Sequence, residues 1–185
     1  MKPIGRMKQA ELAAFIQSSL SRLGIEVVLC GGASVAVYTD NQYVSADIDL
    51  VNVASVPERR LSDAMRSLGF QREGRHFRHP DSSFIVEFPP GPLAVGLEPV
   101  GRVDEIRLTT GVLKIVSPTD CVKDRLAAYF HWNDLQCLEQ AVMVGQAHPI
   151  DLEELRRWSV GEGKGREFSK LESDLTPRRS KPRRK

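Results

Sequence analysis

The sequence has few cysteines and no long apolar segment. Its 185 residues include three cysteines (Cys30, Cys121 and Cys137), and none belongs to a CxxC pair. This sparse, odd set excludes the disulfide framework of a small secreted protein and a cysteine-rich zinc site, so we expect each to be a small apolar core residue. No apolar run approaches the roughly 20 residues that cross a bilayer, and residues 1–20 lack the apolar region of a signal peptide. We therefore expect a cytoplasmic protein without a membrane partner.

Charge of one sign is also lacking, because 26 Lys and Arg stand against 24 Asp and Glu. The net charge of +2 gives no indication of nucleic-acid binding, but the distribution is uneven. Residues 161–185 hold nine basic and four acidic residues, while the rest of the chain holds 17 basic and 20 acidic residues. We expect a slightly acidic globular unit with a basic, disordered tail over 161–185. Its last part, 176–185, is either a solubility tail or a contact for RNA or DNA.

The hydrophobic pattern predicts an α/β (α+β) fold with a helical part after it. Predicted strands cover residues 25–30, 47–51, 83–88, 106–108 and 112–116. Predicted helices cover residues 7–23, 33–38, 55–68, 119–130, 134–147 and 151–159. A hairpin arm is expected over 70–79 and a loop over 91–104. These elements divide the chain into an α/β core over 1–116, a helical part over 117–160 and the tail.

Three carboxylates occupy positions where strands disfavour them. Asp47 and Asp49 alternate with apolar residues, so both point to the same side of a predicted strand. Asp is depleted from strands, and two neighbouring carboxylates repel each other. Glu87 stands alone in another apolar strand and needs a partner or a metal. If the two strands are neighbours, the three acids predict a site for two Mg²⁺ ions, with Mn²⁺ as an alternative.

A glycine turn precedes this acidic pair. Gly31 and Gly32 end a buried strand, and a short helix follows. Free N–H groups at such a helix start attract phosphate, glycine lets the phosphate approach closely, and Ser34 adds a hydroxyl donor. The turn and the acidic strand together therefore predict a metal–nucleotide site.

Each of these features also has a purely structural interpretation. The glycine pair alone is typical of an ordinary loop, and the acidic pair is typical of a polar strand end. Glu87 has Arg72, Arg75 and Arg78 as alternative ion-pair partners. Outside this set, we favour a solvated hairpin for His76 and His79 over an acceptor groove. We likewise favour packing of His131 and Trp132 over base stacking, and a helix-surface ion pair for Asp124 and Arg125.

These motifs resemble the nucleotidyltransferase superfamily, which has a DNA polymerase β-like fold. The family's glycine turn matches residues 29–34, its DhDh strand matches Asp47-Ile-Asp-Leu50, and its third acidic strand matches Val86-Glu-Phe88. The likeness is greatest to bacterial stand-alone nucleotidyltransferase-like proteins related to the AbiEii toxin group. In those proteins a Ser-Pro turn leads into a helix with a lysine, similar to residues 117–123 here, and a polar pair with Asp follows. The family fold is a mixed sheet flanked by helices.

The resemblance implies transfer of a nucleoside monophosphate from an NTP to an acceptor hydroxyl by a toxin-like protein with an antitoxin partner. The acceptor stays open between tRNA, a protein hydroxyl and a small molecule. Asp47, Asp49 and Glu87 would be catalytic and metal-binding. The implied nucleotide-binding residues are Gly31, Gly32, Ser34, Ser45, Lys123 and Asp134. Relatives carry an arginine where this chain has Tyr43. The alternative is a weakly active or inactive protein of the same fold that binds nucleic acid or regulates a partner.

Overall fold

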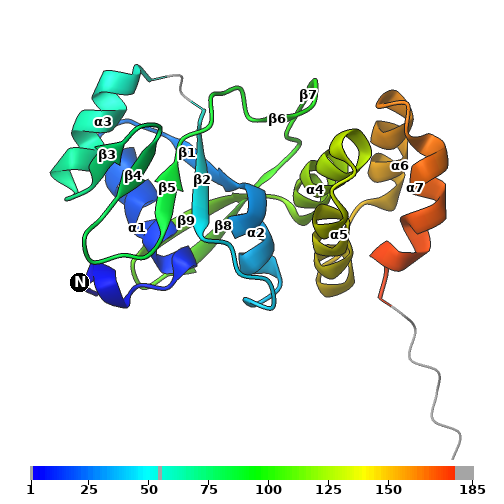
Figure 1. Ribbon diagram of the computed structural model, residues 1–185, viewed down its shortest axis with the longest axis horizontal. Coiled ribbons are helices and arrows are strands. Elements are labelled where there is room, and N and C mark those ends of the chain that lie inside the picture. Colours follow the sequence, from blue (N-terminus) through cyan, green and yellow to red (C-terminus); the bar gives the residue numbers. More distant parts are fainter. Residues whose placement is uncertain (1, 54–55, 178–185) are drawn as a thin grey trace, which may run out of the picture.

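A seven-stranded mixed sheet forms the first half of the molecule in this computed structural model, which describes residues 2–53 and 56–177 (Figure 1). Its spatial order is β3-β4-β5-β2-β1-β9-β8. The strands are β1 (Val27–Cys30), β2 (Asp47–Asn52), β3 (Gln71–Glu73), β4 (His76–Arg78), β5 (Ile85–Glu87), β8 (Val103–Leu108) and β9 (Gly111–Val116). A separate hairpin of β6 (Ala94–Val95) and β7 (Glu98–Pro99) lies in the stretch 91–104, where we expected only a loop.

The central strands run in both directions, so the fold is a mixed α/β sheet flanked by helices, as the sequence predicted. Strand β2 is antiparallel to β1 and parallel to β5, while β1 is parallel to β9. The side chains of Leu29, Ile48, Leu50 and Val86 are fully buried in the core. Because strand side chains alternate between faces, the residues between them point to the opposite side of the sheet.

Helix α1 (Gln9–Ser21) packs against β1 and β9 and runs behind the strands in Figure 1. Its Gln17 amide donates a hydrogen bond to the carbonyl of Lys114 (2.8 Å) and accepts one from the Lys114 amide (2.6 Å). Backbone groups inside a fold need such partners, so the Gln17 side chain satisfies the backbone of Lys114 and fixes α1 against β9. Helix α2 (Gly31–Tyr38) follows β1 directly, and α3 (Glu58–Ser67) precedes the β3–β4 arm.

The predicted start of α3 was only partly correct. The helix begins at Glu58 after Pro57, whose side chain cannot cap it. Ser55, which we expected to cap this helix, lies outside the described residues.

Four helices form the second half of the molecule: α4 (Pro118–Trp132), α5 (Leu135–Ala147), α6 (Leu152–Gly161) and α7 (Gly165–Leu171), followed by the 3-10 turn η2 (Glu172–Leu175). The prediction of a tail from residue 161 was wrong for residues 165–175. Phe168 and Leu175 are fully buried, and Leu171 is nearly so. These three side chains complete the core around Trp158, which is itself fully buried. Of the expected contact at 176–185, all but Thr176 and Pro177 lies outside the described residues.

Among the helices of the described chain, none combines the length and apolar character needed to cross a bilayer.

Candidate functional site

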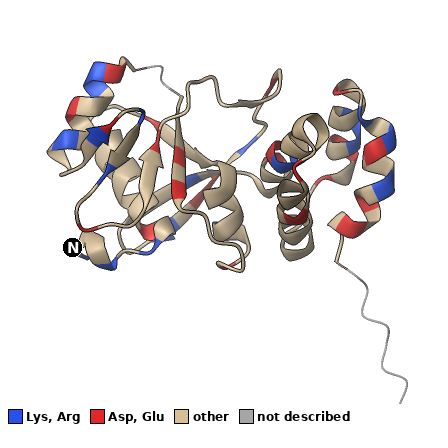
Figure 2. Cartoon of the chain, in the orientation of Figure 1, with Lys and Arg blue, Asp and Glu red and all other residues tan. Residues whose placement is uncertain are grey.

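The sequence-predicted acids share one face of the sheet. Asp49 pairs with Glu87 in the register of β2 and β5, and Asp47 lies two residues earlier on β2, on the same side. Figure 2 shows these two acidic bands on β2, which carries no basic residue. Cys30 pairs with Asp49 on one side, and His76 pairs with Glu87 on the other. The four paired residues Cys30, Asp49, Glu87 and His76 therefore form a row across four neighbouring strands, here called the carboxylate row.

The acids also interact electrostatically. Burial first, and then the negative charges of Glu87 and Asp47, raise the pKa of Asp49 to about 6. The side chains of Asp47 and Asp49 are half-buried, so their charges are only partly screened by water. A cation between them would relieve this repulsion.

The glycine turn fits closely against Asp49. Gly31 is the first residue of α2 and has φ +66°, a conformation that favours glycine. A Cβ atom at Gly31 would lie 2.3 Å from Oδ2 of Asp49, so any larger residue would collide with the carboxylate. A Cβ at Gly32 would lie 3.2 Å from Oγ of Ser45 and 3.5 Å from the ring of Tyr43. The turn is thus directly beside the carboxylate row.

Ser45 lies at this turn, but its hydrogen bonds are local. Its hydroxyl donates to the carbonyl of Asp47 (3.1 Å) and accepts from the Asp47 amide (3.2 Å). The hydroxyl therefore fixes the start of β2, and its side chain remains half-buried over Gly32.

Ser34 is not placed to bind a phosphate. Its side chain is fully buried, and its hydroxyl donates to the carbonyl of Gly31 (2.7 Å) within the same helix. The Sγ atom of Cys121 on α4 lies 3.2 Å away. Serine commonly bonds back to its own helix in this way, so Ser34 joins α2 to α4.

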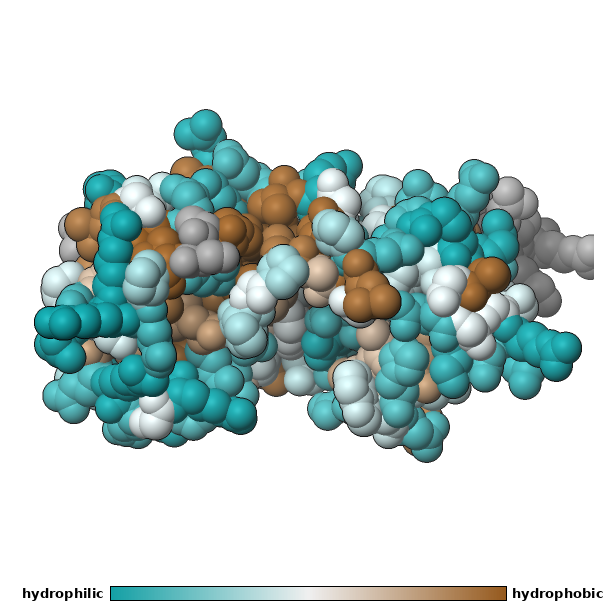
Figure 3. Space-filling model, turned by 90° about the horizontal axis from the view of Figure 1, so that it is seen from above, coloured by the Kyte–Doolittle hydropathy of each residue, from teal (hydrophilic) through white to brown (hydrophobic). Residues whose placement is uncertain are grey.

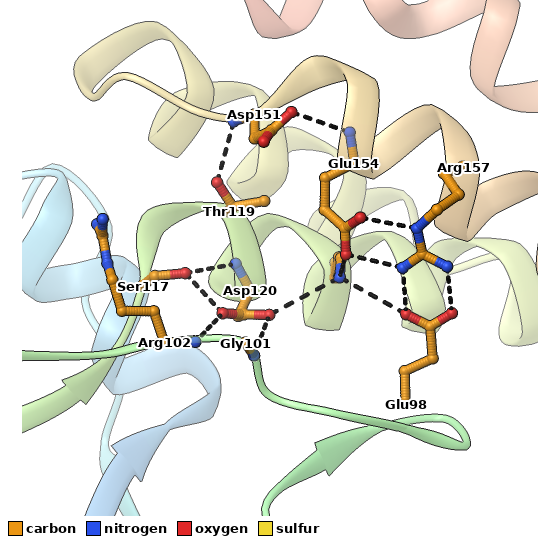
Figure 4. Close-up of polar contacts among 10 residues, drawn as sticks. Glu98, Gly101, Arg102, Ser117, Thr119, Asp120, Asp151, Glu154 and Arg157 are labelled. Carbon is orange, nitrogen blue, oxygen red and sulfur yellow. Dashed lines mark hydrogen bonds and ion pairs between the residues drawn. The ribbon is translucent and has the colours of Figure 1, made fainter.

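Lys123 is also placed differently from the expectation. Its ammonium is 3% exposed and bonds to Glu154 at 2.5 Å, with Glu98 at 3.8 Å and Asp120 at 3.9 Å. Figure 4 shows Glu98, Asp120 and Glu154 around this position, with Arg157 bridging Glu98 and Glu154. This ion cluster joins α4, α6 and β7, and it satisfies Lys123 within the protein.

Asp134, the last residue of the predicted set, caps helix α5. Its carboxylate accepts hydrogen bonds from the amide (3.0 Å) and the thiol (3.3 Å) of Cys137, which hold the pKa of Asp134 below its ordinary range. This is the ordinary task of an aspartate before a helix.

The cation beside the carboxylate row is Arg125, which we had interpreted as part of a helix-surface pair. Its side chain is only 16% exposed, pairs with Asp124 at 2.5 Å and reaches Gln140 at 3.3 Å. Its positive charge lowers the pKa of Asp49, against the larger effect of burial. Arg125 lies one helical turn after Cys121, which faces α2. This one-turn spacing could have indicated from the sequence that Arg125 shares a helix face with Cys121.

His76 is the second residue whose contact at the site was not predicted from the sequence. Its Nδ1 lies 2.7 Å from Oε1 of Glu87, while Nε of Arg75 is 3.9 Å from the other Glu87 oxygen. The hairpin interpretation was right about the β3–β4 arm, but His76 itself contacts Glu87 within the carboxylate row and is only one-third exposed. The alternative ion pair of Glu87 with Arg75 is also present, at long range.

Trp132 does not pack as we expected, because it is 77% exposed. Only its neighbour His131 makes the expected contact with the helical part, through Glu162 at 2.8 Å.

The three carboxylates are chemically suitable ligands for a hard divalent cation. Asp47, Asp49 and Glu87 offer oxygen ligands of the type Mg²⁺ prefers. Burial, followed by the charges of Glu87 and Asp47, raises the pKa of Asp49, so a cation here would favour its ionised form. Within residues 2–53 and 56–177, however, no three acidic, imidazole or thiol groups already meet at metal-binding distance. Glu87 is turned toward His76 instead. A metal held by all three acids would therefore require the Glu87 side chain to rotate.

The architecture is similar to that of a solved antigenic nucleotidyltransferase-like protein from Paracoccidioides brasiliensis. The TM-score is 0.60 at 14% identity, over 90% of this chain and 92% of that one. This chain has the nucleotidyltransferase-like fold. Two structures of the antibiotic-resistance factor ANT(2'')-Ia align at 12% identity with TM-scores of 0.47 and 0.46, over 86% and 84% of this chain and 90% and 94% of theirs. No family model and no curated protein matches the sequence.

The structural likeness concerns the fold. The nucleotidyltransferase-like fold was predicted correctly, while the narrower likeness to the AbiEii group stays a prediction.

Proposed function

We propose that the chain transfers a nucleoside monophosphate from an NTP to an acceptor hydroxyl. The observation that carries this proposal is the shared face of Asp47, Asp49 and Glu87 directly beside the Gly31-Gly32 turn. A nucleotidyltransferase-like fold with that arrangement has both parts the reaction needs, which are a polyphosphate cradle and acidic groups for a cation.

In the reaction, the acceptor oxygen forms a bond to the α-phosphorus and loses its proton to solvent or a nearby base. The bond from the α-phosphorus to its bridging oxygen breaks, and pyrophosphate leaves. Mg²⁺ or Mn²⁺, held by Asp47, Asp49 and Glu87, would supply Lewis-acid stabilisation of phosphate charge.

The protein's own groups position the NTP. The N–H groups at the start of α2 favour phosphate oxygens, because a helix start leaves them without backbone partners. Gly31 and Gly32 leave room for this approach. Arg125, although paired with Asp124, is the cation that lowers the pKa of Asp49. Lys123, which the resemblance had implied, is instead buried against Glu154.

A labelled-NTP assay tests the proposal. Wild-type protein, Mg²⁺ and each α-³²P-labelled NTP are incubated with tRNA or with a protein acceptor fraction, and the label in each fraction is counted. We expect incorporation by the wild type, abolition by EDTA and loss of at least about 10³-fold in Asp49→Asn.

Asp63→Asn is the matched control, because Asp63 is an exposed acid on α3 that pairs only with Arg66. Equal incorporation by wild type and Asp49→Asn would overturn the mechanism. The two fractions also test the tRNA and protein acceptors separately, while the toxin role and the antitoxin stay predictions.

A second candidate is a catalytically inactive module that binds nucleic acid or a partner. It is favoured by the contact of Glu87 with His76, and by the burial of Lys123. Titration calorimetry with ATP and Mg²⁺ separates the candidates. Metal-dependent ATP binding supports the transferase. Salt-sensitive RNA binding without ATP binding supports the module, and its loss on deleting 176–185 assigns it to the basic tail.

A further inference from the structure

A cavity of about 420 Å³ lies away from the carboxylate face, between α3, the β3–β4 arm and the segment that follows β5. Its volume is within the range of small-molecule sites. Seen from above in Figure 3, hydrophobic side chains form a band across the sheet half, with hydrophilic side chains along its borders. The residues that line the cavity include Glu58, Leu61, Arg72, Arg75, Phe77 and Phe88.

The floor of the cavity is apolar and partly aromatic. Phe77 is almost fully buried, and its ring meets that of Phe88 edge-to-face with centroids 5.5 Å apart. Leu61 of α3 adds an aliphatic wall. Aromatic rings arranged in this way favour contact with another flat, apolar group.

The rim of the cavity is positively charged. Arg72 is fixed by an ion pair with Glu58 and by a hydrogen bond to the carbonyl of Gly74 (2.8 Å). Arg75 is 83% exposed, and its Nε lies 3.9 Å from a Glu87 oxygen. Among the lining residues, two guanidinium groups stand against the carboxylate of Glu58, and the long contact with Glu87 offsets the charge of Arg75 only in part.

Helix α3 adds to this polarity. Its first residue, Glu58, and its fourth, Leu61, both line the cavity, so the positive end of the helix dipole is at the rim. Pro57, directly before the helix, has no side-chain acceptor for the first N–H groups.

We propose that this cavity binds a small molecule with a flat apolar ring and an anionic group, phosphate or carboxylate. The ring lies on Phe77 and Phe88, and the anion pairs with Arg75. This site does not depend on the proposed nucleotidyl transfer, because its ligand is recognised on the other face of the sheet.

The cavity is nevertheless connected to the carboxylate row. Glu87 and Phe88 are consecutive and point to opposite faces, and Arg75 reaches both the cavity rim and Glu87. An anion that pairs with Arg75 would therefore withdraw a positive charge from Glu87.

Phenyl phosphate is the probe for this site, and two-dimensional amide NMR of the full chain is the measurement. We expect saturable shifts at residues lining the cavity, with a dissociation constant on the order of 1 mM or lower. Inorganic phosphate and benzyl alcohol, which each lack one half of the probe, should bind at least about tenfold more weakly.

Two variants separate the contributions of the arginine and of the aromatic ring to binding of the probe. Arg75→Gln should weaken phenyl phosphate binding about tenfold, and Phe88→Leu should weaken phenyl phosphate but not inorganic phosphate. The matched control is Arg107→Gln, because Arg107 is exposed on β8, at the opposite edge of the sheet from β3. The amide spectra also show whether each variant is folded.

Three results would overturn the proposal: no saturable shift, equal binding of either half-probe, or unchanged affinity in Arg75→Gln. None of them bears on nucleotidyl transfer, because no NTP or metal is present.

Discussion

Nδ1 of His76 lies 2.7 Å from Oε1 of Glu87, across the antiparallel pair of β4 and β5. A carboxylate only accepts hydrogen bonds, so Nδ1 carries the proton in this contact. The imidazole therefore limits the rotation of a carboxylate that the proposed reaction uses.

This contact predicts that His76 holds Glu87 turned away from a metal. His76→Ala should therefore lower the Mg²⁺ concentration at half-maximal nucleotidyl transfer about fivefold to tenfold, which is the worth of one lost hydrogen bond. The measurement is kcat and KM for the labelled NTP over a Mg²⁺ titration. In a Glu87→Gln background, His76→Ala should cause no further change, and an additive change would show that His76 acts independently of Glu87.

The crowded acids predict that Asp49 reduces the stability of the metal-free protein. Asp49→Asn removes a half-buried charge beside two others, so it should raise the free energy of unfolding by about 1–2 kcal/mol at pH 7.5 in EDTA. Urea unfolding followed by circular dichroism measures this difference. Mg²⁺ should then stabilise the wild type but not the variant. A less stable variant in EDTA would contradict the electrostatic argument.

The fit of Gly31 against Asp49 predicts a strong response to one methyl group. Gly31→Ala combines a positive φ with a collision at 2.3 Å, so it should cost at least about 1–2 kcal/mol of stability. Gly161→Ala is the control, since no atom lies within 4 Å of its added Cβ. Thermal unfolding of both variants tests this, and equal melting temperatures would show that the turn tolerates a side chain.

The ion cluster around Lys123 predicts a loss of stability in acid. Arg157 and Lys123 lower the pKa of Glu154 to about 2, below the ordinary value near 4.5. The stabilisation by this carboxylate is therefore present above about pH 4.5 and is lost as the pH falls toward 2.

Glu154→Gln should cost about 1–3 kcal/mol at pH 7, and the difference from wild type should shrink below pH 4. Urea unfolding at several pH values measures it. Glu153→Gln, an exposed neighbour on the same helix, should be neutral throughout. A difference that stays constant down to pH 2 would exclude the lowered pKa.

Helix α7 predicts that residues after 161 belong to the folded unit. Phe168 is fully buried, so Phe168→Ala should cost about 3–5 kcal/mol, whereas the exposed Lys170→Ala should cost little. Chemical denaturation compares the two, and similar midpoints would show that α7 contributes nothing to stability.

Local patterns predicted the elements of the site better than its contacts. The strands around residues 27–30, 47–52 and 85–87 and the turn at Gly31 follow from apolar runs and a glycine pair, which are local signals. Helix α7 was missed because Phe168 and Leu171 are isolated apolar residues in a highly charged stretch. Such a helix is stable only through packing against the rest of the fold.

The partners of the charged side chains could not be predicted in the same way. Lys123 pairs with Glu154, 31 residues later, so the burial of its ammonium depends on how α6 packs against α4. Arg125 was misjudged because the pair with Asp124 is visible in sequence, while the effect of its charge on Asp49, 76 residues earlier in the chain, is not.

The way in which the carboxylate row is spaced determines which substitutions leave its geometry unchanged. Its members are spaced by backbone hydrogen bonds between strands, about 4.8 Å apart, and not by the shapes of the core side chains beneath them. Core residues can therefore be exchanged extensively while the separation of Asp49 and Glu87 is preserved. Such tolerance is one physical way in which two chains can share a fold at 14% identity.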